Sequence, residues 1–214
     1  MIDKKKLSRA FNISILIAHG CLLFVVGFIF VICFTSTVTL FTWHPILLTI
    51  GWVFLLQGIL IFPRENIVTR DLSHKWRVTL HWILQSVGAL SLLCGFIIII
   101  VNKFKRDGYH FQTYHSQYGL AFFILAALTI SGGVYTNFFK NTVFYKFVHS
   151  IFGIGTLIIG AVAFILSFYS GFTVQHSAKF MQYLCITLLI YVHIIVLLRP
   201  LLTMLNRIRY LAKA

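Results

Sequence analysis

The chain has 214 residues, of which 59% are hydrophobic and only 10% are charged. A soluble domain would carry roughly a quarter charged residues, so this composition excludes an ordinary soluble enzyme and indicates that lipid is the solvent. The formal net charge is +14, but the basic residues stand at the ends of apolar stretches, so nucleic acid is not an expected partner. We therefore predict a single membrane domain over residues 1–214.

Six apolar stretches are long enough to cross a bilayer, which takes about 20 helical residues. In chain order they are predicted at approximately 11–34, 44–62, 78–101, 115–139, 148–170 and 179–202. The first is too long for a typical cleaved signal sequence. The loops are short, which predicts that neighbouring helices are antiparallel. The expected fold class is all-α, a polytopic membrane protein of six transmembrane helices.

Lysine and arginine residues are divided unequally between the two predicted sides of the membrane. Fourteen of the 18 fall on the side that holds both termini. Because basic residues concentrate in cytoplasmic segments, both termini are predicted to lie in the cytoplasm. The four on the opposite side are Lys103, Lys105, Arg106 and Lys179.

Nine histidines in so apolar a chain require an explanation, because ionisable groups at membrane depth are costly and usually functional. His74, His110 and His176 are predicted in loops. His19 and His193 lie in the first and last spans, where hydrogen-bonded packing is the commoner role. The other four each stand at or near the start of their own span, at successive separations of 37, 34 and 34 residues. They are His44, His81, His115 and His149.

Helix direction alternates, so His44 and His115 are predicted at the outer depth and His81 and His149 at the inner depth. Spans two to five can form a four-helix core that brings each pair together. Two opposed imidazoles in an apolar bundle are the ligands of a bis-histidine haem, because neutral nitrogen donors suit iron. The span that begins at His115 is roughly 36 Å long, so two haems would lie in different leaflets. We expect electron transfer, since both axial positions are filled.

Small residues near these histidines are consistent with a flat porphyrin lying against the helices, although close helix packing explains each of them equally well. They are Gly51, Gly58, Gly88, Gly119, Gly132, Gly133, Gly153 and Gly155. The four acidic residues all lie outside the predicted spans, which disfavours a proton-coupled transporter.

The residues around the four histidines resemble the cytochrome b561 family over essentially the whole chain. The matching pieces are Trp43-His44-Pro45, Leu80-His81-Trp82, Tyr114-His115-Ser116-Gln117, Ser131-Gly132-Gly133 and Val148-His149-Ser150. The small size and the His-Trp and Ser-Gly-Gly elements most resemble the compact transmembrane-reductase branch. The resemblance implies two b haems, with His44 and His115 on the outer iron and His81 and His149 on the cytoplasmic iron.

The resemblance also implies cytosolic ascorbate as electron donor, and monodehydroascorbate or a ferric chelate as acceptor on the far side. Ascorbate is an anion, so basic residues near the inner haem are candidate contacts, although ordinary membrane topology also accounts for them. These are Lys75, Arg77, Lys140 and Lys146. On the outer side the candidates are Lys105, Arg106 and His110, for which a solvated loop is an equal alternative. An endoplasmic-reticulum or vesicle membrane and a homodimer are further implications.

Two other interpretations stay open at this point. The chain could carry two haems but accept electrons from a quinol or a flavoprotein. Alternatively, it could be a haem-free membrane scaffold or small transporter that uses its histidines for packing or for a metal ion.

Overall fold

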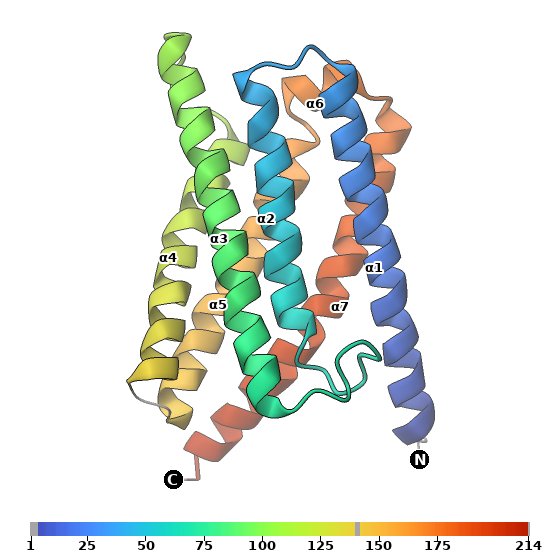
Figure 1. Cartoon of the computed structure of the whole chain (residues 1–214), viewed down its shortest axis with the longest axis vertical. Coiled ribbons are helices and arrows are strands. Elements are labelled where there is room, and N and C mark those ends of the chain that lie inside the picture. The colour runs from blue at the N-terminus through green and yellow to red at the C-terminus, as the bar shows by residue number, and fades with distance from the viewer. Residues whose placement is uncertain (1–3, 140–141, 214) are drawn as a thin grey trace. The chain divides into compact units, whose positions relative to one another are not determined.

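The computed structural model describes residues 4–139 and 142–213, and the described residues are almost entirely helical, with no β-strand (Figure 1). Six long helices in this part of the chain are apolar enough to cross a membrane, which confirms the predicted all-α, six-span fold. They are α1 (Lys4–Thr35), α2 (Trp43–Leu60), α3 (His74–Lys105), α4 (Tyr114–Phe138), α5 (Val143–Ser167) and α7 (Lys179–Leu211). The 3₁₀ turn η1 (Leu40–Thr42) and the short helix α6 (Gly171–His176) were not predicted.

Three helices, α1, α3 and α7, extend well beyond the stretches that hydropathy predicts. Polar residues continue these helices past the apolar core; α3 begins at His74, where the Ser73 hydroxyl accepts a hydrogen bond from the Trp76 backbone N–H. Helix α7 continues through Pro200, which transmembrane helices tolerate. Two histidines that were predicted in loops lie instead at helix ends: His74 begins α3 and His176 ends α6, and both are exposed.

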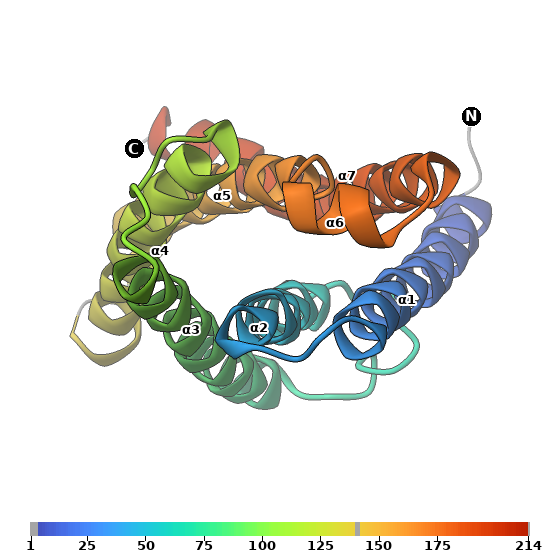
Figure 2. The same ribbon diagram turned by 90° about the horizontal axis from the view of Figure 1, so that it is seen from above.

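The chain divides into two compact units. The first comprises Met1–His110 and His176–Ile195, and the second comprises Phe111–Gln175 and Val196–Ala214. Within the first unit α2 and α3 form an antiparallel hairpin, and within the second α4 and α5 do the same (Figures 1 and 2). The organisation of residues 1–214 as one domain remains a prediction.

Glycines bring the two helices of the first hairpin into backbone contact. A Cβ atom on Gly51 would lie 2.8 Å from the carbonyl oxygen of Gly88, and one on Gly88 would lie 2.9 Å from that of Gly51. Ser91 adds an interhelical hydrogen bond, donating from Oγ to the Leu47 carbonyl at 2.8 Å. Close approach at small residues is how transmembrane helices pack, so helix packing accounts for this glycine pair.

Two further histidines have packing roles inside the first unit. The Trp52 indole N–H donates to Nε2 of His193 at 3.2 Å, and Nδ1 of His193 donates to the Leu189 carbonyl at 2.6 Å. His19 accepts at Nδ1 a hydrogen bond from the Gln57 amide at 3.1 Å. The bonds of Trp52 and Gln57 join α7 and α1 to α2. The bond to Leu189 lies within α7 and uses the second nitrogen of His193.

Candidate functional site

The two histidines of the first hairpin bond reciprocally to the backbone of each other's helix. Nδ1 of His44, on α2, donates to the carbonyl oxygen of Gly95 on α3 at 3.0 Å. Nδ1 of His81, on α3, donates to the carbonyl oxygen of Gly58 on α2 at 2.8 Å. Each imidazole is thus oriented by the partner helix of its own hairpin.

The second hairpin repeats this arrangement. Nδ1 of His115, on α4, donates to the Ala163 carbonyl on α5 at 2.9 Å, and Nδ1 of His149, on α5, donates to the Thr129 carbonyl on α4 at 3.1 Å. A carbonyl oxygen only accepts, so in all four rings Nδ1 carries the proton and Nε2 carries the lone pair. Metal-ligating histidines are typically fixed in this way.

The four hydrogen bonds share one spacing along the chain. In every case the accepting residue lies fourteen positions after the histidine of its own helix, as Gly58 does after His44. Fourteen helical residues rise roughly 21 Å. Each hairpin therefore places its two imidazoles at two different depths. The distance between these depths is the same in both hairpins and fits within a hydrocarbon core of roughly 30 Å.

Aromatic rings lie beside the histidines of the first hairpin. The Phe62 ring centroid is 5.1 Å from that of His81, and the Phe41 centroid is 6.0 Å from that of His44. The four candidate ligands His44, His81, His115 and His149 are all half-buried.

In the second hairpin a glycine makes room for an imidazole. A Cβ atom on Gly133 would lie only 3.1 Å from Cε1 of His149. By contrast, a Cβ atom on Gly119, one turn after His115, or on Gly155 would meet nothing within 4 Å. The open space at Gly119 leaves room for a flat macrocycle beside His115, and imidazoles fixed through Nδ1 suit iron, so these residues fit a haem.

The candidate substrate residues lie in different environments. Lys75, Lys105 and Arg106 are exposed, whereas Lys146 and His110 are half-buried. Lys140 lies outside the described residues.

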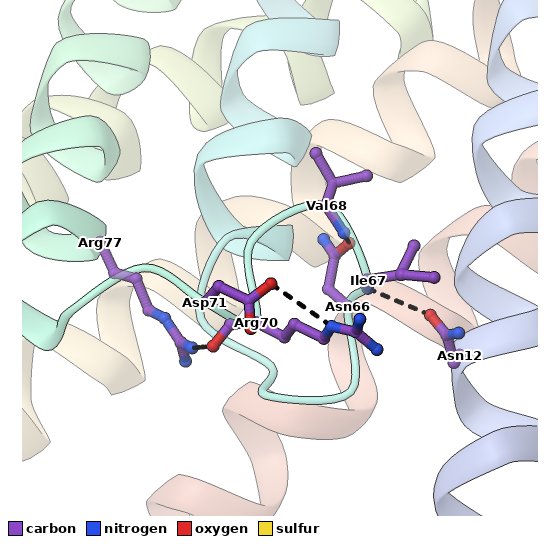
Figure 3. A network of polar contacts seen from close by, with 7 residues as sticks. All are labelled: Asn12, Asn66, Ile67, Val68, Arg70, Asp71 and Arg77. Atoms are coloured by element: carbon purple, nitrogen blue, oxygen red, sulfur yellow. Dashed lines mark hydrogen bonds and ion pairs between the residues drawn. The ribbon is translucent and has the colours of Figure 1, made fainter.

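Arg77 differs from these residues because its side chain is buried, with 7% of its surface exposed. Its guanidinium donates to three backbone carbonyls: Nε to Leu72 at 3.1 Å, Nη1 to Phe62 at 3.1 Å and Nη2 to Arg70 at 2.8 Å. Figure 3 shows the bond to Arg70. Charge and spacing in the sequence gave no sign of this burial.

Arg207 is a residue near the candidate site that hydropathy did not identify. Its Nη1 donates to the Lys146 carbonyl at 2.7 Å and also bonds to the Ser150 hydroxyl. These residues flank His149 on α5. The predicted last span stopped at residue 202, so the helical extension that carries Arg207 was not expected.

The fold and the four fixed imidazoles define a class: an all-α, multi-pass membrane protein whose histidines are held as metal ligands are held. Residues 43–175 match the family described as eukaryotic cytochrome b561. The transmembrane reductase CYB561D2 of Mus musculus is 31% identical over 156 residues, which cover 69% of this chain and 70% of the mouse protein. The Bos taurus and Homo sapiens proteins of the same name are each 37% identical over 97 residues, which cover 45% of this chain and 44% of each relative. No solved structure matches.

The chain belongs to the cytochrome b561 family, as its sequence motifs predicted. Membership makes it a transmembrane electron-transfer protein, an oxidoreductase, with haem b as its cofactor.

Proposed function

We propose that the chain transfers electrons from cytosolic ascorbate, through two b-type haems, to monodehydroascorbate or a ferric chelate on the non-cytoplasmic side. His44 and His115 ligate the outer haem iron, and His81 and His149 ligate the cytoplasmic one. The observation that supports this assignment is the hydrogen bond from Nδ1 to a carbonyl, which all four histidines make with the same fourteen-residue spacing.

The residues of the chain fit this role in three respects. When bound, haem iron supplies one-electron chemistry by alternating between its ferric and ferrous states. With the proton on Nδ1, Nε2 is the nitrogen through which each imidazole would ligate iron, and the helices that carry the rings are strongly apolar. Because two imidazole levels stand roughly 21 Å apart in each hairpin, one level can serve each leaflet.

Lys75, Lys140 and Lys146 are the proposed contacts for the ascorbate anion, since positive charge raises the local concentration of an anionic donor. Arg77, the fourth candidate from the sequence, is not proposed as a contact because its three nitrogens donate to backbone carbonyls. Lys105, Arg106 and His110 are the proposed contacts for the acceptor. The excess of basic residues supports cytoplasmic termini. A location in the endoplasmic reticulum or in vesicles, and a homodimer, follow from the family resemblance alone.

The direct test is reconstitution of the purified chain into vesicles that contain ascorbate, with a ferric chelate outside. We expect reduction of the external chelate at a rate well above that of protein-free vesicles, with loss of this activity in His81→Ala. A protein reduced by a quinol but not by ascorbate would contradict the proposed donor while leaving the haem ligands unchallenged.

The donor contacts have a matched pair of variants. Lys75→Ala should raise the half-saturating ascorbate concentration several-fold without changing the haem content, because a positive charge is removed from the donor side. Lys179→Ala removes an exposed lysine on the predicted opposite side and should have no such effect. Equal effects in the two variants would reject Lys75 as a donor contact.

A further inference from the structure

The connection between α2 and α3, residues 61–73, is a folded loop held by buried polar side chains (Figure 3). Asn66, with 3% of its surface exposed, donates from Nδ2 to the Leu60 carbonyl at 2.7 Å and accepts at Oδ1 from the Val68 N–H at 3.0 Å. Thr69, with 8% exposed, donates from Oγ1 to the Ile61 carbonyl at 3.0 Å. The loop therefore has a defined conformation set by its own sequence.

Arg77 closes this loop from the first turns of α3. Its three hydrogen bonds reach carbonyls at both ends of the loop, those of Phe62, Arg70 and Leu72. The planar guanidinium donates from three separate nitrogens, whereas a lysine ammonium would have to reach all three carbonyls from a single nitrogen. The polar partners of Arg77 are backbone carbonyls, none of which carries a full negative charge.

The same loop reaches the imidazole of His81 through Phe62. Arg77 holds the Phe62 carbonyl, and the Phe62 ring lies against the His81 ring with 5.1 Å between their centroids. Arg77 and His81 are four residues apart on α3 and so share one face of the helix. The His81 ring is thereby bounded by the Gly58 carbonyl at Nδ1 and by an aromatic ring that Arg77 anchors.

We propose that Arg77 is a positioning residue for His81, with two effects on the haem that His81 ligates. Through the loop, it fixes Phe62 against the imidazole and so sets the orientation of the ring. Its buried positive charge, one helical turn from His81, favours the ferrous form of that haem, because reduction lowers the positive charge at the iron. This inference rests on the proposed function, since it requires His81 to be an axial ligand.

The test is a redox titration of the purified full-length chain by haem absorbance, combined with electron paramagnetic resonance of the ferric form. In Arg77→Met we expect the equilibrium constant for reduction of one haem to fall about tenfold, or about 59 mV for a one-electron couple. The resonance signal of that haem should shift as well. Arg77→Lys retains the charge, so it should keep most of the potential while still altering the signal.

Two further variants separate the loop from the charge. Phe62→Leu should alter the resonance signal of the same haem with little change in potential. Arg70→Met is the matched control, because Arg70 lies in the same loop but its side chain is 58% exposed and pairs with Asp71. It should change neither property.

The inference is overturned if Arg77→Met keeps both haems with potentials and signals like those of the parent. Should Arg77→Met fail to fold, Phe62→Leu decides the positioning effect, and an unchanged signal in that variant also overturns it. A parent protein without haem would instead reject the proposed function, so the two failures are distinguishable.

Discussion

The two hairpins carry the same histidine scheme, but they accommodate their imidazoles in different ways. Beside His81 in the first hairpin stands an aromatic side chain, Phe62, which a buried arginine anchors. Beside His149 in the second stands Gly133, where the absence of a side chain makes room for the ring. What the hairpins share is the fourteen-residue spacing between histidine and carbonyl acceptor. The fourteen-residue spacing is therefore common to both hairpins, whereas the residues that pack beside each imidazole differ between them.

The largest expected effect is loss of haem from substitution of a single ligand. His44→Ala, or the same change at His81, His115 or His149, should remove one of the two proposed haems, so the haem content per chain should fall by about half. A pyridine haemochrome assay of the purified protein measures this. His193→Leu is the control, because both nitrogens of that ring are engaged in packing, and it should retain both haems. Loss of haem in His193→Leu would contradict the assignment of His193 as a packing residue rather than a haem ligand.

A side chain introduced beside His149 should disturb one haem selectively. In Gly133→Val the Cβ atom would begin 3.1 Å from Cε1 of His149, so the ring must tilt and weaken its bond to the Thr129 carbonyl. We expect occupancy of one haem to fall several-fold. Gly20→Val is the control, because a Cβ atom there meets nothing within 4 Å, and haem content should stay unchanged. Full occupancy in Gly133→Val would show that the glycine is not needed for the ring.

A packing glycine of the first hairpin should instead affect stability. In Gly51→Ala the new Cβ atom would lie 2.8 Å from the Gly88 carbonyl oxygen, which is backbone and cannot move aside easily. Overpacking of this kind costs about 1–3 kcal/mol. Unfolding in detergent should therefore occur at lower temperature, while the folded fraction keeps its haem spectrum. A changed haem spectrum with unchanged stability in Gly51→Ala would contradict the packing role assigned to Gly51.

The smallest effect concerns one interhelical hydrogen bond of the first hairpin. Ser91→Ala removes the donor to the Leu47 carbonyl. Such bonds between transmembrane helices contribute about 0.6 kcal/mol on average. The same unfolding assay should show a shift smaller than that of Gly51→Ala, and a larger one would point to a further role for the Ser91 hydroxyl.

The amino-acid sequence predicted the number and order of the spans, because hydropathy reports directly on which residues the bilayer can hold. It did not predict how far α1, α3 and α7 extend, since helices continue into polar surroundings where hydropathy carries no signal. The four histidines could be singled out by their matched depths. Their carbonyl acceptors could not, because the spacing depends on the relative register of two helices, and the acceptors Thr129 and Ala163 belong to no recognisable motif.

The charge and position of Arg77 in the sequence suggested a substrate contact. The burial of its side chain could not be predicted, because it depends on the folded loop that the hydrogen bonds of Asn66 and Thr69 stabilise. The glycines illustrate the same difficulty. In the sequence all eight look alike, whereas the structure separates the backbone contact at Gly51 from the space beside His149 at Gly133.

In the proposed function each haem takes one ligand from each hairpin, His44 with His115 and His81 with His149. The haem content of double variants tests this pairing. The variant His44→Ala with His115→Ala removes both ligands of one haem and should retain about one haem per chain. The variant His44→Ala with His81→Ala disables both sites and should retain none. Equal haem content in the two double variants would contradict the proposed pairing.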